Sequence, residues 1–394
     1  MKLYQEGILE QYLKEKNDKL TNRSILLTAN TPIIDFDDMA YMVEISLGTP
    51  GQQFVVFLDS GSANLWVPDQ SCSQRNSTTC GTYCKETPYD TCLTFCQDAC
   101  CSKETDLRAK TCLSKRRFNQ NVSSTYVPQN ASFDLIYQTG EVRGFLGKDT
   151  FCLSGTTLCV ENQIFGQAKI MAEAFSRQPQ DGIIGLGWPA LAYNNINPPI
   201  FNFLDQKLLD KPYFVIYMKN LGPTSDNNGG QLTVGGLDTV NCESYYDPIP
   251  LTSKTFWQFK LTKVSVGSYN VSPRSGWQAV SNTAATFIGG PKSIIDKIAL
   301  EVGAKPTMLE AYFIDCDSKP NDIVFTINGK DYHITAANYI ISAGAGPCMF
   351  AFFPFTSGGF YPSWMLGPPL IREYCQIHNM ANGTIGMAKS KSLV

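Results

Sequence analysis

An acidic residue stands between two apolar segments in the first sixth of the chain. Val55-Val56-Phe57-Leu58 leads into Asp59-Ser60-Gly61-Ser62, and Leu65-Trp66-Val67 follows. A carboxylate between two buried strands loses its water, which is costly unless a partner or a reaction uses the group. Gly61 permits a tight turn, and the flanking hydroxyls can hydrogen-bond the acid. The segment predicts an active-site loop, or the remains of one, whose acid–base chemistry needs a second acid facing Asp59.

A weak internal repeat indicates where that second acid would stand. The Asp59 loop is followed by Asp181-Gly182-Ile183-Ile184-Gly185, and Ala279-Val280-Ser281-Asn282-Thr283-Ala284-Ala285 is followed by Ser363-Trp364-Met365-Leu366-Gly367. Asp59 and Gly185 are 126 positions apart, and Asn282 and Gly367 are 85 apart; the difference equals the 41 residues of the segment 72–112. Two equivalent halves, of which the first carries an insert, are the simplest account.

The elements that must position these loops are mostly strands. Tyr41–Leu47 precedes a Gly48–Gly51 turn, and short apolar runs bounded by Gly, Asn or Pro recur almost to the end. Helical patterns are few. Lys292–Val302 is the clearest, and Pro291 stands just before it. A short amphipathic helix is expected at 7–16. The sequence predicts an all-β protein with minor helices.

Composition excludes several classes of function. The chain has 394 residues, a net charge of −3 and a pI near 5.6, which argues against a nucleic-acid partner. No apolar run approaches the length of a membrane span. The two histidines, His333 and His378, lie in no motif of a catalytic triad or a metal site. We therefore expect no cofactor and no bound metal.

Cysteines and glycosylation sequons point to an oxidising compartment. The chain has 14 Cys, and it carries sequons at Asn22, Asn76, Asn121, Asn130, Asn270 and Asn382. This combination favours a secreted, extracellular glycoprotein, with an endolysosomal location as the alternative. No signal peptide is visible at residue 1, so we interpret Met1 as the start of a processed or truncated chain.

The segment 72–112 is rich in cysteine and poor in apolar residues. Its eight cysteines are Cys72, Cys80, Cys84, Cys92, Cys96, Cys100, Cys101 and Cys112. The spacings of Cys80 to Cys84 and of Cys92 to Cys96 would suit zinc, but an oxidised chain favours disulfides. We expect a disulfide-stapled surface insert, whose pairing the sequence leaves open among 105 arrangements.

Several further motifs follow one another along the chain. They are Gly48-Thr49-Pro50, the Asp59 loop with Asn64-Leu65-Trp66-Val67-Pro68, Ile136-Tyr137-Gln138-Thr139-Gly140, Asp181–Gly187, Leu232-Thr233-Val234-Gly235-Gly236, Asp322-Ile323-Val324-Phe325 and Leu370-Ile371-Arg372-Glu373-Tyr374. Through these motifs the chain resembles the pepsin-like aspartic proteases over nearly its whole length.

The resemblance implies a bilobal pepsin-like fold, with two β-barrel-like lobes, a central cleft and an interdomain sheet. Residues 1–30 would be a propeptide remnant, 31–240 the first lobe and 241–394 the second lobe. Tyr137 would lie on a hairpin flap with Trp66 beneath it, although Gln138 replaces the usual Gly of the flap tip. The residues expected to bind substrate are Gly61, Ser62, Trp66, Tyr137 and Thr283.

The remaining cysteines are expected to form three pairs. By resemblance Cys316 pairs with Cys348, and Cys242 with Cys375 on the interdomain sheet. Cys152 and Cys159 flank an expected hairpin tip and should pair with each other.

Family chemistry requires two acids that share one proton, so that one acts as base on a water and the other as acid. Here Asp59 is the surviving acid, and Asn282 stands at the position of the second. An amide cannot exchange a proton at a useful pKa. Ala284 also adds a methyl group where backbones should approach closely, and Gly367-Pro368-Pro369 should alter a strand start or form a rigid turn.

The resemblance and its departures predict a proteolytically inactive homologue that keeps its peptide-binding cleft. The alternatives are an active or weakly active acid endopeptidase that cleaves between hydrophobic residues, or an active enzyme whose acid was changed to Asn282. The expected partners are a peptide, lipid or protein ligand in the cleft and the chain's own propeptide, through Lys19 or Arg23. The insert is a second candidate binding surface, and the protein is expected to be a monomer.

Overall fold

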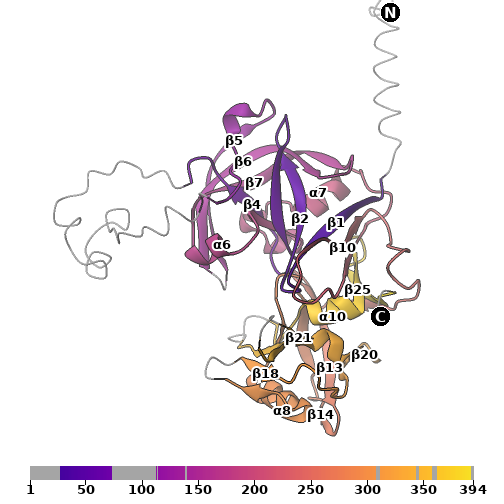
Figure 1. Cartoon of the computed structure of the whole chain (residues 1–394). Coiled ribbons are helices and arrows are strands. Elements are labelled where there is room, and N and C mark those ends of the chain that lie inside the picture. The colour runs from indigo at the N-terminus through magenta and orange to yellow at the C-terminus, as the bar shows by residue number, and fades with distance from the viewer. Residues whose placement is uncertain are drawn as a thin grey trace, which may run out of the picture.

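The computed structural model describes residues 27–72, 112, 114–137, 140–307, 311–342, 346–356 and 362–391. These residues form three sheets with a few short helices, which confirms the all-β prediction. The first half of the chain forms one lobe and the second half another, with strands of both halves joined between them (Figure 1). The boundary at 240/241 stays a prediction.

The described part of the chain consists of short strands and a few short helices. The strands before residue 240 are β1 (Ala29–Phe36), β2 (Ala40–Leu47), β3 (Gln52–Asp59), β4 (Leu65–Pro68), β5 (Val127–Tyr137), β6 (Gly140–Leu153), β7 (Cys159–Met171), β8 (Gly182–Gly185), β9 (Tyr213–Met218) and β10 (Asp226–Val234). Those after residue 240 are β11 (Pro248–Pro250), β12 (Ser253–Lys254), β13 (Trp257–Val266), β14 (Tyr269–Val271), β15 (Trp277–Ser281), β16 (Ile288–Gly290), β17 (Lys305–Pro306), β18 (Tyr312–Ile314), β19 (Ile323–Ile327), β20 (Lys330–Ile334), β21 (Ile340–Ile341), β22 (Cys348–Phe350), β23 (Phe352–Pro354), β24 (Trp364–Leu366), β25 (Tyr374–Asn379) and β26 (Thr384–Lys389). The helices are η2 (Gln120–Val122), α6 (Glu173–Arg177), η3 (Pro189–Leu191), η4 (Tyr193–Asn195), α7 (Pro199–Asp205), α8 (Lys292–Val302), α9 (Ala336–Tyr339) and α10 (Pro368–Glu373).

The first lobe closes on itself. From β2 the pairing runs through β3, β8, β4, β7 and β6, and β6 pairs back onto β2. Closure removes free sheet edges, and the alternation of buried and exposed residues along β3 fills the interior with Phe54, Val56 and Leu58. The long β5–β6 hairpin extends from this barrel.

The second lobe is organised around a mixed sheet in the order β20-β19-β13-β15-β24-β16-β23, with β12 and β14 also paired to β13. A smaller sheet, β17-β18-β22-β21, lies beside it in the chain. Helix α8 has the predicted bounds, since Pro291 precedes it and Gly303 ends it with a φ of +80°. It buries Ile294, Ile295 and Ile298 on one face.

An interdomain sheet joins the two lobes. Its order is β11-β26-β25-β9-β10-β1, so β25 near the end of the chain pairs with β9, and β1 pairs in turn with β2 of the barrel. In Figure 1, α10 and β25 lie between the first lobe, in purple and magenta, and the second lobe, in orange. Motion of one lobe against the other must therefore bend this sheet.

The internal repeat is visible as two matching parallel pairs. Strand β3 runs parallel to β8 with Asp59 opposite Gly185, and β15 runs parallel to β24 with Ser281 opposite Leu366. The spacings of 126 and 85 residues thus correspond to the same register in the two lobes.

The expectation for Gly367-Pro368-Pro369 as an altered strand start is wrong. Strand β24 ends at Leu366, and Pro368 opens helix α10 as its first residue. Proline suits this position because the first turn of a helix needs no donor from its N–H. The two prolines therefore fit their place and carry no sign of damage to the sheet.

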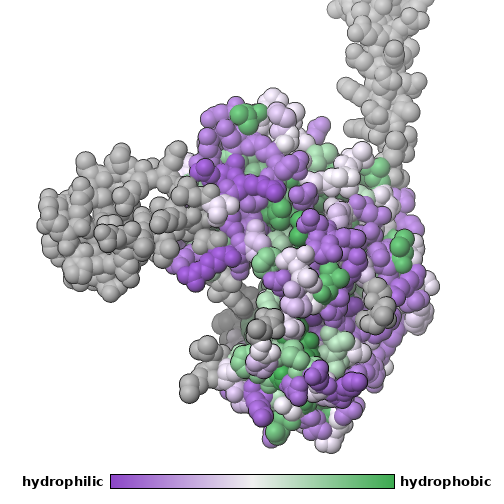
Figure 2. Space-filling view, in the orientation of Figure 1, coloured by the Kyte–Doolittle hydropathy of each residue, from purple (hydrophilic) through white to green (hydrophobic). Residues whose placement is uncertain are grey.

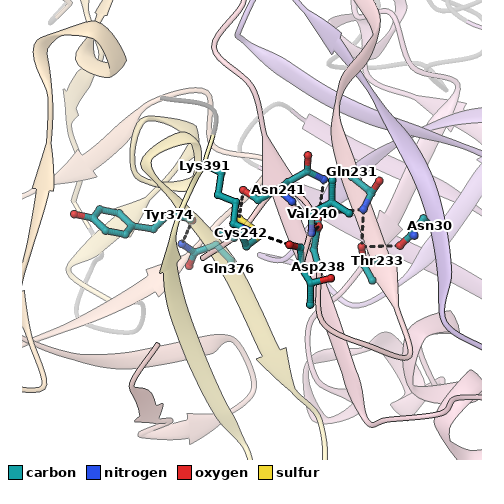
Figure 3. Close-up of a disulfide and its surroundings, with 12 residues drawn as sticks. Asn30, Gln231, Thr233, Asp238, Val240, Asn241, Cys242, Tyr374, Gln376 and Lys391 are labelled. Atoms are coloured by element: carbon teal, nitrogen blue, oxygen red, sulfur yellow. Dashed lines mark hydrogen bonds between the residues drawn. A yellow bond between two sulfur atoms is a disulfide. The ribbon is translucent and has the colours of Figure 1, made fainter. Parts of the chain in front are cut away.

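The structure forms the three disulfides expected outside the insert, Cys152–Cys159, Cys242–Cys375 and Cys316–Cys348, and it also pairs Cys72 with Cys112 at the ends of the insert. Figure 3 shows Cys242 beside a polar network in which Asp238 accepts hydrogen bonds from Asn241 and Gln231. The other six cysteines of the insert lie outside the described residues.

The visible surface of the described chain is largely hydrophilic, with hydrophobic side chains in small separate areas (Figure 2). Among the described residues, no helix is long and apolar enough to cross a membrane.

Candidate functional site

Asp59 is the last residue of β3 and is 5% exposed. Its Oδ1 accepts a hydrogen bond from Gly61 N at 2.8 Å, and its Oδ2 accepts one from the Ser62 hydroxyl at 2.5 Å. Burial raises the pKa of this carboxyl, while the hydrogen bonds from Ser62 and Gly61 oppose the rise. Asp59 therefore keeps its proton to a higher pH than an exposed aspartate does.

Asn282 takes the corresponding place after β15. Its Oδ1 accepts a hydrogen bond from Ala284 N at 2.9 Å, as Asp59 Oδ1 does from Gly61 N. Its Nδ2 lies 3.2 Å from the sulfur of Met365, to which it can donate. These two contacts orient the amide, so the oxygen faces its own loop and the nitrogen faces β24.

Ser60 and Thr283 join the two loops to each other. Ser60 N donates to Thr283 Oγ1 at 2.9 Å, and Thr283 N donates to Ser60 Oγ at 3.0 Å. The same hydroxyls reach further: Thr283 Oγ1 donates to Leu58 O at 2.7 Å, and Ser60 Oγ donates to Ser281 O at 2.8 Å. Sequence reasoning included Thr283 but missed Ser60 as a site residue, although its position next to Asp59 was a usable signal.

Gly61 lies against Asn282 of the facing loop. A Cβ atom added at Gly61 would lie 2.6 Å from Asn282 Nδ2, which is closer than non-bonded atoms allow. Gly61 is thus required by proximity, since no side chain fits between it and Asn282. In the second loop Ala284 N donates to Asn282 Oδ1, as Gly61 N donates to Asp59 Oδ1 in the first.

Trp66 and Tyr137 meet as the sequence predicts. Trp66 Nε1 donates to the Tyr137 hydroxyl at 3.0 Å, and Phe175 of α6 packs edge-on against both rings at 5.5 and 5.9 Å between centroids. Tyr137 ends β5 at the tip of the β5–β6 hairpin. Burial, and then the charge of Asp59, raise the pKa of the Tyr137 hydroxyl, which stays protonated and available as a donor. Gln138 lies outside the described residues.

Asp181 braces the strand that carries Asp59. Its Oδ2 accepts a hydrogen bond from Val55 N in β3, and its Oδ1 accepts one from Arg116 N, both at 2.9 Å. Lys115, which is 8% exposed, donates to the carbonyls of Gln178 and Gln180 beside it. The chain leaving the insert is therefore fastened to the base of the first-lobe loop.

The described residues contain no group of three or more His, Cys, Asp or Glu side chains that could hold a metal ion. The zinc alternative falls on cysteines outside the described part of the chain, as do Asn22, Asn76 and the propeptide candidates Lys19 and Arg23. The four described sequons, Asn121, Asn130, Asn270 and Asn382, are all exposed.

Comparison with known proteins identifies one family. The family model of eukaryotic aspartyl proteases matches residues 40–390. "Aspartic protease 10" of Caenorhabditis elegans is 55% identical over 391 residues, which cover 98% of this chain and 91% of that protein. "Aspartic protease 2" of Necator americanus is 38% identical over 91% of this chain and 85% of its own length. "Cathepsin E" of Aquarana catesbeiana is 31% identical over 92% of this chain and 82% of its own length.

Proposed function

The chain belongs to the eukaryotic aspartyl protease family, and from that premise we propose that it is a non-catalytic member whose cleft binds a peptide or protein ligand. The observation that carries the proposal is Asn282, an amide at the place where pseudo-symmetry with Asp59 calls for an acid. The hydrogen bonds between the Asp59 and Asn282 loops support a retained binding site.

Proton transfer explains why this substitution matters. Peptide hydrolysis by two carboxyls requires one base for the water and one acid for the scissile carbonyl. Asn282 can donate hydrogen bonds but cannot supply or take up a proton. One well-placed acid–base group is worth roughly 10² to 10⁴ in rate, and Asp59 also loses the partner that would set its titration. Peptide cleavage is expected to be lost.

The binding elements support a retained cleft. The Ser60–Thr283 hydrogen bonds hold the two loops together, and the Trp66–Tyr137 hydrogen bond positions the hairpin. With Gly61 and Ser62 around Asp59, these groups offer donors and acceptors to an extended backbone. A peptide or an extended protein segment can bind to these groups whether or not it is cleaved.

A cleavage assay tests the proposal. An unfolded protein substrate, incubated between about pH 3 and pH 5 with and without pepstatin, should stay intact in the presence of the wild-type chain. The double variant Asn282→Asp/Ala284→Gly is the smallest change expected to give cleavage. The matched control adds Asp59→Asn to that double variant and should again be inactive. Pepstatin-sensitive cleavage by the wild type would overturn the proposal.

The second candidate is an active or weakly active acid endopeptidase, which the protease names of the relatives favour. In that case hydrolysis would proceed through Asp59 alone, and Asn282→Asp should change the rate little. A wild type that cleaves slowly, together with an Asp59→Asn variant that does not, would support this candidate.

We further propose that the protein is a secreted or endolysosomal glycoprotein that acts as a monomer and retains residues 1–30. The four disulfides and four exposed sequons of the described residues support an oxidising compartment. A chain without activity cannot remove its own propeptide. Mass spectrometry of the secreted protein, before and after enzymatic removal of N-glycans, reports glycosylation and the N-terminus together; a terminus produced without any added protease contradicts the proposal.

A further inference from the structure

A buried histidine lies in the interdomain sheet, away from the groups of the proposed site. His378 belongs to β25 and is 0% exposed. Its ring stacks on Phe214 of β9, with 4.1 Å between centroids and 5° between planes, and meets Trp257 of β13 edge-on at 4.7 Å. His378 thus lies between a first-lobe strand and a second-lobe strand.

Both ring nitrogens of His378 lack a hydrogen-bond partner among the described residues. The backbone groups of Phe214 and Gln376 lie near enough to favour the charged ring slightly, but neither completes a hydrogen bond of acceptable geometry. Buried polar atoms without partners are rare in folded proteins, and each calls for an explanation. A phenylalanine would fill the same aromatic site without leaving two nitrogens unsatisfied.

The surroundings of His378 hold no compensating charge. His378 is surrounded by Phe214 of β9, by Trp257 of β13 and by its own cross-strand partner, Ile385 of β26. Of the charged groups in the described chain, none contributes to the shift in its pKa. The cationic Lys254 lies over the ring of Trp188, 5.1 Å from its centroid, and Trp188 in turn packs against Trp257. A proton on His378 would therefore be buried with no anion beside it among the described residues.

A short chain of contacts connects His378 to the candidate site. Trp257 Nε1 donates to Leu186 O at 2.9 Å, and Leu186 N donates to Asp59 O at 2.8 Å. Trp257 therefore holds Leu186, and Leu186 holds the backbone of Asp59. A displacement of Trp257 would remove its hydrogen bond to Leu186, the residue whose N–H donates to Asp59 O.

We propose that His378 is an acid-sensitive switch at the junction of the lobes, in which protonation of the buried ring expels it from its contacts with Phe214 and Trp257 and releases the segment under Asp59. This goes beyond the proposed function, since it concerns when the cleft is formed and not what it binds.

The direction of the pH dependence follows from burial. Burial lowers the pKa of His378 from 6.5 to about 3 in the folded protein. Between these two values the unfolded chain binds the proton and the folded chain does not, so stability is complete above pH 6.5 and is lost as the pH falls toward 3. In that window protonation of His378 alone should raise the unfolding equilibrium constant by up to about tenfold for each unit by which the pH falls.

Urea unfolding of the full chain, measured from about pH 4 to pH 7.5, tests the switch. His378→Phe keeps the aromatic contact and removes the proton site. For each unit by which the pH falls, the unfolding equilibrium constant of the wild type should therefore rise by up to about tenfold more than that of the variant. The matched control is His333→Gln, because His333 is the other histidine and is half exposed beside Asp322. This control keeps His378, so its pH dependence should stay steeper than that of His378→Phe. Parallel curves for His378→Phe and the wild type would overturn the proposal.

A second measurement needs no variant at position 378. In the wild type the ring signals of the two histidines can be followed by NMR, with His333→Gln used to assign them. The His378 ring should stay neutral until near-ultraviolet circular dichroism reports that tryptophan packing is lost. A His378 ring that titrates near pH 6.5 while this packing stays intact would contradict the proposal.

Discussion

Ser60 and Thr283 exchange hydrogen bonds across the boundary between the two lobes, each donating its backbone N–H to the other's hydroxyl oxygen, at 2.9 and 3.0 Å. Because the bonds are reciprocal, each loop fixes the position of the other. These bonds hold the two loops together without any contribution from the side chains of Asp59 and Asn282. This support predicts a cost in stability when either hydroxyl is removed.

Thr283→Val should lower the free energy of unfolding by about 3 kcal/mol, because it leaves Ser60 N and the Leu58 carbonyl buried without a partner. Urea unfolding at neutral pH measures the loss. Thr239→Val makes the same chemical change at an exposed position and should stay within about 0.5 kcal/mol of the wild type. Equal stability of the two variants would show that the loops do not depend on this hydroxyl.

Trp66→Phe should weaken binding of pepstatin, used as a probe of the cleft, by roughly 2- to 10-fold. The variant keeps an aromatic ring against Phe175 but loses the hydrogen bond to the Tyr137 hydroxyl, worth about 0.5–1.5 kcal/mol. Tyr137→Phe removes the same bond from its other end. Because both changes delete one interaction, the double variant should bind about as well as either single variant. Fully additive losses in titration calorimetry would argue against the bond.

Asp35→Asn should stabilise the protein at neutral and alkaline pH. Asp35 is 0% exposed, and its Oδ2 has no partner among the described residues. Burial, and next the charge of Asp38, raise its pKa from 3.8 to about 8, while Arg372 opposes the rise. Between these values the folded state holds the extra proton, so the wild type loses stability as pH rises, by up to about 1.4 kcal/mol per pH unit.

An asparagine at position 35 can donate to Asp38 without titrating. The gain in melting temperature of Asp35→Asn should therefore widen from about pH 4 to pH 8 and then level off. Asp226→Asn serves as control, because Asp226 pairs with Asp35 across the strands and is exposed. A gain that does not change with pH would mean that Asp35 is not the group responsible.

The Cys242–Cys375 disulfide should contribute more to stability than the Cys152–Cys159 disulfide. The first closes a separation of 133 residues and ties the start of the second half to the interdomain sheet, whereas the second closes 7 residues at a hairpin. Loop-closure entropy predicts losses of about 5 and about 2 kcal/mol when each pair is replaced by alanines. Urea unfolding of the two double variants compares them, and a reversed order would show that chain entropy is not the main effect.

Much of the fold could be predicted because its signals are local. The apolar run before Asp59 and its repetition before Asn282 each specify a strand followed by a tight loop, and the matched spacings place both loops in equivalent halves. Pro291 and the apolar spacing of 292–302 specify the bounds of α8. The same local reasoning failed at Pro368, because proline suits both a strand edge and a first helical turn, and only packing distinguishes them.

By itself, then, the sequence determined the two-lobed strand architecture, the loops that face each other and the amide that stands at Asn282. The tertiary structure alone decided which polar groups are paired: Ser60 with Thr283 across the lobes, and His378 with nothing among the described residues. Pairing depends on atoms that are 221 or more residues apart in the chain meeting within about 3 Å, and no periodicity or local motif encodes such a distance.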